Sequence, residues 1–129
     1  MSMVHPVKTT LLTLVMVLPA LASPQEEIVS LVRSIQRADY EGNRPELDKL
    51  HTRLSQFHAG PNASRVHYWL GFASWRRALN GFNDGADPAE IAADLNRAIA
   101  DFERAVEADP RFHDARIGAA SCLGNLIFL

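Results

Sequence analysis

The sequence predicts an all-α fold: antiparallel helical hairpins, about five helices in all, that follow a signal peptide. Two observations lead to this prediction. After residue 22, apolar residues recur at steps of three and four, which is the spacing of one face of a helix. Short segments rich in Pro, Gly, Asn and Asp separate these stretches, and residue types that cap helices stand at their ends. We therefore expect one helical domain over residues 23–129.

The first 22 residues have the pattern of a secretory signal. Residues 1–8 are weakly basic, residues 11–21 are apolar, and Ala20 and Ala22 are the small residues that a signal peptidase reads. The apolar run has eleven residues, fewer than the roughly 20 that a helix needs to cross a bilayer. We predict cleavage after Ala22, a periplasmic or secreted chain, and no stable membrane span after cleavage. The alternatives are an uncleaved short anchor and a buried first helix of a cytosolic protein.

The mature chain would be a single domain with a mildly acidic balance. Removal of residues 1–22 takes away one lysine and no acidic residue, so 107 residues remain with 12 basic and 15 acidic side chains. The resulting charge of −3 gives no reason to expect nucleic acid or an anionic membrane as a partner. The one cysteine, Cys122, cannot form an internal disulfide. We expect it to be a small buried residue, because Ala and Leu residues surround it in the sequence.

Two helices are expected before residue 60. The first begins at Ser23, a capping hydroxyl with an acid at Glu26, and ends at Gly42. The second covers about residues 45–58 and is preceded by Asn43 in a capping position. The apolar stripes are Ile28, Leu31, Val32, Ile35 and Ala38 on the first helix, and Leu47, Leu50, Leu54 and Phe57 on the second. A short loop joins the two helices, which predicts an antiparallel hairpin.

A third helix is expected over residues 63–79, after the break at Gly60-Pro61 and with Asn62 as its cap. This stretch is apolar on two sides, which is typical of a helix held between neighbours. We therefore expect it at the centre of the fold. A loop is predicted over residues 81–86, because Gly, Asn and Asp favour turns. Asp87 is expected to cap the next helix.

The clearest helix lies between Ile91 and Pro110, and the proline sets its end. Its apolar stripe comprises Ile91, Leu95, Ala98, Phe102, Ala105 and Val106. Two alanines bracket Phe102, and we expect their small size to let a neighbouring helix approach while the ring fills the gap. Unlike charges alternate one turn apart on the opposite side and predict a solvated face. These residues are Asp94, Arg97, Asp101 and Arg104.

Four residues of this helix have the spacing of the second helix of a tetratricopeptide repeat (TPR): Ala98, Phe102, Ala105 and Pro110. Upstream, Leu70-Gly71 resembles the Leu-Gly pair of that family's first helix. The chain departs from the family at His67 and Ser74, where the family has Trp and Tyr, and in the extra residues 80–87, where the family has a tight turn. The resemblance covers about half of the chain, residues 61–123, and the first two helices would form a degenerate repeat. It implies a solenoid of helical hairpins with a scaffold or adaptor role.

The last segment begins after Pro110 as a further hairpin arm, with apolar residues at positions 115, 119, 120 and 123. It ends in an apolar run, residues 126–129, without a partner helix or the polar outer face that a terminal repeat normally carries. Two interpretations follow from this pattern. Either the chain is a fragment of a longer protein, or its apolar end folds back or docks onto another subunit in a homo-oligomer.

Five residues on one face of the third helix form the candidate partner site: Arg65, Tyr68, Phe72, Trp75 and Arg76. The resemblance implies that this face lines a concave groove that holds a partner protein or peptide. Aromatic and Arg side chains are also the types that carry most of the binding energy at interfaces. The alternative is that Phe72 and Trp75 belong to the core.

Other functional classes have little support in the sequence. The histidines lack ligand spacing such as i and i+4, so we predict no metal and no other cofactor. No nucleophile elbow, phosphate-binding glycine run or catalytic carboxylate pair is present, so we do not expect an enzyme. The leading prediction is an exported module that binds a protein or peptide. One rival is a helical accessory region of a longer enzyme or assembly factor. Another is a small-molecule carrier with an apolar pocket near Trp69 and Trp75.

Overall fold

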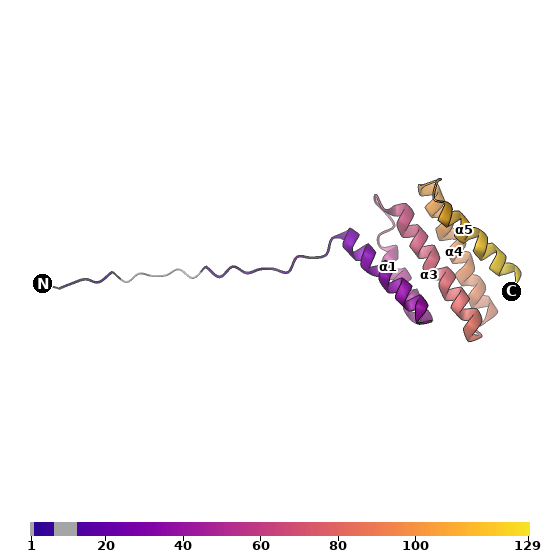
Figure 1. The fold of residues 1–129 in the computed structure, drawn as a ribbon, viewed down its shortest axis with the longest axis horizontal. Helices are drawn as coiled ribbons and strands as arrows, with labels where there is room; N and C mark the ends of the chain where they lie inside the picture. Colours follow the sequence, from indigo (N-terminus) through magenta and orange to yellow (C-terminus); the bar gives the residue numbers. More distant parts are fainter. Residues whose placement is uncertain (1, 7–12) are drawn as a thin grey trace.

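The computed structural model describes residues 2–6 and 13–129, and within that part every regular element is an α-helix. The helices are α1 (Pro24–Tyr40), α2 (Arg44–Ser55), α3 (Ala63–Asp84), α4 (Pro88–Ala108) and α5 (His113–Ile127). They pack side by side in one body, as Figure 1 shows. The predicted all-α class is therefore confirmed.

Residues 13–21, in the described part of the chain before α1, do not pack into the helical body. Residues 13–22 carry no regular structure, and the segment runs away from the helices (Figure 1). Its apolar side chains are exposed; Leu14 and Leu18, for example, are 75% and 81% exposed. The described part of this segment is therefore not a buried first helix, while residues 7–12 of the predicted signal lie outside the described residues. None of the described helices combines the length and the apolar character that a membrane span requires.

Three of the four predicted helix caps are formed. The side chains of Ser23 and Asn43 accept hydrogen bonds from backbone amides three residues later, at 3.2 and 3.1 Å. Asp87 accepts one from the amide two residues later, at 2.8 Å. Asn62 stands at the predicted N-cap position of α3, but its side chain makes no capping bond and instead donates to Gln25 Oε1 at 2.6 Å. This contact ties the start of α3 to the start of α1, so tertiary packing uses the amide that local capping would have needed.

The predicted loop over residues 81–86 is shorter than expected, because α3 continues to Asp84. Gly81 is buried, and a Cβ added there would lie 3.1 Å from Ile91 Cγ1. This glycine therefore permits close contact between α3 and α4 and does not form a turn. Gly85 ends the helix with a φ of 67°, in the left-handed region that favours glycine. Of the extra residues 80–87, residues 80–84 thus lengthen α3, and residues 85–87 connect it to α4.

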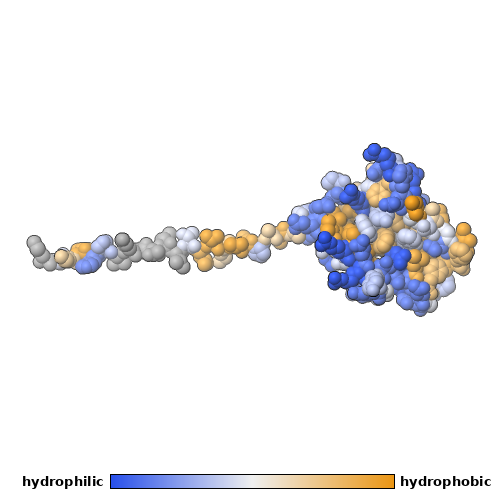
Figure 2. Space-filling view, viewed as in Figure 1, coloured by the Kyte–Doolittle hydropathy of each residue, from blue (hydrophilic) through white to orange (hydrophobic). Residues whose placement is uncertain are grey.

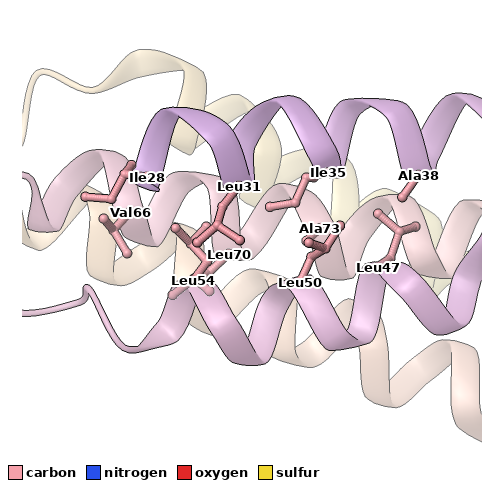
Figure 3. Close-up of a cluster of buried hydrophobic side chains, with 10 residues drawn as sticks. All are labelled: Ile28, Leu31, Ile35, Ala38, Leu47, Leu50, Leu54, Val66, Leu70 and Ala73. Atoms are coloured by element: carbon pink, nitrogen blue, oxygen red, sulfur yellow. The ribbon is translucent and has the colours of Figure 1, made fainter. Parts of the chain in front are cut away.

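The helix α3 lies at the centre of the fold, as predicted. Its backbone lies next to all four other helices, whereas α1 adjoins α2 and α3, and α5 adjoins α4 and α3. Two hydrophobic clusters result. The first joins α1, α2 and α3 (Figure 3), and its buried members are Ile28, Leu31, Ile35, Ala38, Leu47, Leu50, Leu54, Val66, Leu70 and Ala73. The second joins α3, α4 and α5 around Phe102.

Phe102 of α4 is fully buried between glycines of two neighbouring helices. A Cβ added at Gly71 of α3 would lie 2.9 Å from the Phe102 ring, and one added at Gly118 of α5 would lie 2.6 Å from it. Ala98 and Ala105, one turn before and after Phe102, are also fully buried. The predicted burial of Phe102 between these alanines is confirmed, and the close approach of the neighbouring helices is made at Gly71 and Gly118, which the prediction did not name.

Candidate functional site

The predicted partner site lies on the side of α3 between α1 and α5. Tyr68, Phe72 and Trp75 are half-buried, and successive ring centroids are 6.5 and 6.3 Å apart. Trp69, also half-buried, lies 5.0 Å from Phe72, centroid to centroid. Aromatic rings attract one another in tilted and edge-to-face contacts at such distances. We call these four residues the α3 aromatic strip.

One end of the strip is anchored at Tyr68. Its ring centroid lies 5.7 Å from that of Phe102 and 5.1 Å from that of Phe112, which directly precedes α5. Burial raises the pKa of Tyr68, and the nearby carboxylate of Asp114 raises it further. The hydroxyl group is therefore protonated at neutral pH and able to donate a hydrogen bond.

The other end of the strip is fixed to α5. Trp75 Nε1 donates a hydrogen bond to Asn125 Oδ1 at 3.0 Å. The Trp75 ring also meets the ring of Phe102 edge to face, with 6.3 Å between centroids. Because the indole N–H is used within the fold, any contact of Trp75 with a partner would be made through its ring carbons.

The two arginines of the predicted site have different surroundings. Arg76 Nε donates to Asp39 Oδ1 on α1 at 2.8 Å, and its guanidinium carbon lies 5.8 Å from the Trp75 ring centroid, within cation–π range. Arg65, near the start of α3, is exposed. The structure therefore brings Arg76 together with the aromatic residues and leaves Arg65 at the solvent-exposed edge of the site.

The aromatic strip combines a fixed geometry with partial access to solvent. Tyr68, Phe72 and Trp75 pack against the second hydrophobic cluster, and Trp69 and Phe72 pack against the first. All four nevertheless keep part of their surface exposed. The strip therefore has features of both interpretations of the sequence, the groove and the core.

A polar site that the sequence analysis missed lies where α2, α3 and α4 meet. Asp94 and Asp101, predicted on a solvated face of α4, are each only 4% exposed. The expected pairs within α4 do form, with Arg97 3.7 Å from Asp94 and Arg104 3.1 Å from Asp101. Contacts with α2 and α3 account for the burial of Asp94 and Asp101. We give the name polar seam to the set of polar contacts that link α2, α3 and α4: Arg44–Glu90, Arg77–Glu90, Arg77–Asp94, Arg97–Asp48, Arg97–Ser74 and His51–Asp101.

The centre of the polar seam is the contact between Arg77 of α3 and Asp94 of α4. Arg77 Nη1 donates to Asp94 Oδ2 at 2.6 Å, and Arg77 Nη2 donates to Glu90 Oε1 at 2.7 Å. Burial raises the pKa of Asp94, although Arg77 and Arg97 oppose this rise. A desolvated carboxylate of this kind depends on its cations, so removing one partner costs much more than the pair contributes.

The spacing of the charged residues in the sequence indicates which helix faces form this seam. Residues 44, 48 and 51 on α2 recur at steps of four and three, and so do residues 90, 94, 97 and 101 on α4. Each set therefore lies along one face of its helix. Spacing does not reveal that the two faces meet, because the partners are 46 to 50 residues apart in the chain.

One end of the seam opens into a pocket of about 420 Å³ between α2, α3 and α4. It is lined by His51, Ser55, His58, His67, Leu70, Arg97, Asp101 and Arg104. His51 Nε2 lies 3.1 Å from Asp101 Oδ2, whereas His67 Nδ1 lies 3.7 Å from Asp101 Oδ1 and has no hydrogen-bond partner. Burial lowers the pKa of His67, and Asp101 opposes this effect. Among the described residues, no group of three or more His, Cys, Asp or Glu side chains is arranged to hold a metal ion.

Cys122 is fully buried in the second hydrophobic cluster, as predicted. Burial raises the pKa of its thiol to about 12. The reactive thiolate is therefore scarce at neutral pH, which leaves Cys122 a packing role.

The aromatic strip remains the candidate binding surface. In comparisons with known proteins, no protein-family model, curated protein or solved structure matches the chain.

Proposed function

We propose that residues 23–129 form a TPR-like module of helical hairpins that binds a protein or peptide partner, in a scaffold or adaptor role. The packing of the helices supports this proposal. The helix α3 adjoins both α1 and α5, while α2 and α4 each pack against the two odd-numbered helices that flank them in the chain. This is the order expected of stacked hairpins, in which one helix of each hairpin contributes to a common face.

The observation that carries the proposal is the position of the α3 aromatic strip on the face shared by α1, α3 and α5. Trp and Tyr side chains supply large, rigid contact areas and dominate the binding energy of many interfaces. Here the rings are already held in place, by Phe102 on one side and by Asn125 through Trp75. A partner would therefore bind without the entropy cost of ordering them.

The charges around the strip favour a partner with an acidic group near one end. Arg76 is already paired with Asp39, so it contributes little additional attraction. Arg65 is exposed at the edge of the strip, and its guanidinium group could form a charge-assisted contact with a partner carboxylate.

We also propose that this module acts in the periplasm or outside the cell. The basic start, the short apolar run and the small residues before Ser23 support export. Residues 13–21 are exposed and carry no regular structure, which is compatible with removal of that segment. Sequencing the amino terminus of the exported protein tests this, because cleavage after Ala22 leaves Ser23 as the first residue.

A photocrosslinking experiment tests the binding surface. A photoreactive phenylalanine replaces Arg65 at the edge of the strip, and a matched control carries it at Thr52, an exposed residue of α2. Irradiation in the exporting cell should crosslink a partner protein from position 65 and not from position 52. A peptide from that partner should then change the emission of Trp69 and Trp75, which are the chain's two tryptophans and both lie in the strip.

Two results would overturn the proposal. One is crosslinking of equal yield from positions 65 and 52, which would show that contact is not selective for this face. The other is a peptide that binds without changing tryptophan emission, because such a peptide would bind away from the strip. The variant Arg65→Glu provides a further check, since it should weaken a partner that carries an acidic group and leave the fold intact.

A further inference from the structure

The helix α5 is apolar on two sides, and only one of them is covered by the described part of the chain. On the inner side, Ala115 and Cys122 are fully buried and Gly118 lies against Phe102. On the outer side, Leu123 is 54% exposed and apolar residues continue toward the end of the helix. Figure 2 shows a hydrophobic surface at this end of the body, where Figure 1 places α4 and α5. A helix with two apolar sides is typically held between neighbours, as α3 is in this fold.

The outer side of α5 forms a groove with α4, with a volume of about 450 Å³. Its lining residues are Glu103, Val106, Glu107, Arg116, Ala119, Ala120 and Leu123. The two alanines are small enough to let another helix backbone approach closely, and Val106 and Leu123 provide larger apolar side chains. The size and the polarity of the groove therefore suit a helix with an apolar stripe.

The fold itself shows what fills a groove of this kind. The helix α5 packs against α4 and α3, with Ala115, Gly118 and Cys122 buried around Phe102. In the same way, α3 packs against α1 and α2. The groove between α1 and α2 and the groove between α3 and α4 are thus each occupied by the helix that follows, and side chains of α4 meet those of α2 and α3 in the polar seam. The groove between α4 and α5 is the next position in this series.

The charges at the groove indicate the chemistry of its occupant. Glu103 and Glu107 are exposed and one turn apart on α4, and neither has an ion-pair partner among the described residues, unlike Glu90 on the same helix. Arg116 is the one cation of the lining, and its Nη2 donates to the Pro110 carbonyl oxygen at 2.8 Å. The α4 side of the groove is therefore negatively charged, and basic residues on the occupant would complement it.

We propose that the groove between α4 and α5 binds an amphipathic helix of another protein. Its apolar stripe would lie over Ala119, Ala120 and Leu123, and flanking Lys or Arg side chains would meet Glu103 and Glu107. This surface is separate from the α3 aromatic strip, so the inference stands independently of the proposed function.

The test uses the exported chain and two designed, hydrocarbon-stapled helical peptides of 15 residues, the length of α5. Both peptides carry the same Leu and Ala stripe, which lysines flank in one and glutamates in the other. Fluorescence anisotropy should show saturable binding of the lysine peptide, at least about tenfold tighter than that of the glutamate peptide. The double variant Glu103→Lys, Glu107→Lys should reverse this preference.

A steric variant tests whether the peptide lies in the groove. Leu123→Arg places a long charged side chain on its exposed wall and should weaken the lysine peptide by at least about tenfold. The matched control is Val29→Arg on α1, at a site that is also exposed (40%), and it should change nothing. Circular dichroism checks that both variants fold, and the charge reversal provides a readout that does not depend on position 123.

Three outcomes would overturn the inference. The lysine peptide shows no saturable binding up to about 1 mM, or it binds Leu123→Arg as well as the unaltered chain. In the third, sedimentation shows the unaltered chain to be a dimer that Leu123→Arg dissociates, which would make a second copy the occupant. Tryptophan emission distinguishes this inference from the proposed function. A peptide in the α4–α5 groove should leave the emission unchanged, because neither Trp69 nor Trp75 lines that groove, whereas a peptide on the strip should change it.

Discussion

Replacing Gly118 by Ala should destabilise the protein through one steric contact. The added Cβ would lie 2.6, 2.7 and 2.8 Å from three atoms of the Phe102 ring. The ring is fully buried, and the backbone of Gly71 also packs closely against it, since a Cβ there would lie 2.9 Å from its Cγ and Cδ1 atoms. Overpacking of a well-packed core costs about 1–3 kcal/mol, and three short contacts with a confined ring place this substitution near the upper end.

A second glycine of α5 separates this contact from the general effect of adding a methyl group. Ala stabilises the interior of a helix relative to Gly by about 1 kcal/mol, and this gain applies at both positions. A Cβ at Gly124 would meet nothing within 4 Å, so Gly124→Ala should stabilise the protein by up to about 1 kcal/mol. Gly118→Ala should destabilise it by about 2 kcal/mol in net terms, a difference of about 3 kcal/mol between the two variants.

Urea unfolding followed by tryptophan emission measures both changes, because Trp75 packs against Phe102. Phe102→Leu should cost less in the Gly118→Ala background than in the unaltered chain, since the shorter side chain relieves the contact. Equal stability of Gly118→Ala and Gly124→Ala would refute the argument. So would additive effects of Gly118→Ala and Phe102→Leu, which would show that the two positions do not interact.

Three further predictions concern ionisable groups. Arg77→Met should lower the free energy of unfolding in urea by about 3 kcal/mol, because buried Asp94 loses its nearest cation. Arg104→Met removes a side chain that is 57% exposed and should lower it by less than about 1 kcal/mol. Equal losses in the two variants would contradict this. Burial lowers the pKa of His67 from 6.5, so the unfolded chain binds the proton more readily and stability should fall as the pH drops below 6.5. His67→Gln should reduce that slope, and an unchanged slope would count against the argument. Cys122, with a pKa of about 12, should react with Ellman's reagent only as fast as the protein opens; rapid stoichiometric reaction of the folded chain would disprove this.

Features that depend on neighbours in the sequence were predicted well. Ser23, Asn43 and Asp87 form their caps as expected, because capping involves amides only two or three residues away. The burial of Phe102 was also predicted from its own helix. Alanines lie one turn before and one turn after it, and their small side chains leave room for neighbouring helices to approach. What the sequence did not reveal is that glycines of α3 and α5 enclose the ring.

Features that depend on distant partners were predicted poorly. Asp94 and Asp101 have the spacing of a solvated face, and their burial arises from Arg77 on α3 and His51 on α2. Asn62 has the position of a cap, and its side chain is taken by Gln25. In each case the local pattern is compatible with two environments, and a residue far away in the chain decides between them. The aromatic strip has the same ambiguity, because half-buried rings satisfy both the groove and the core interpretation.

The polar seam also specifies how the hairpins align. Its bridging pairs run in the same order along α2 and α4: Arg44 with Glu90, Asp48 with Arg97, and His51 with Asp101. A slide of α4 by one turn in either direction would bring Asp48 level with Asp94 or Asp101, so an ion pair would become a repulsion between carboxylates. Apolar stripes resist such a slide less, because residues of similar size can replace one another in a core. We infer that the bridging charges contribute to the choice of one alignment between α2 and α4.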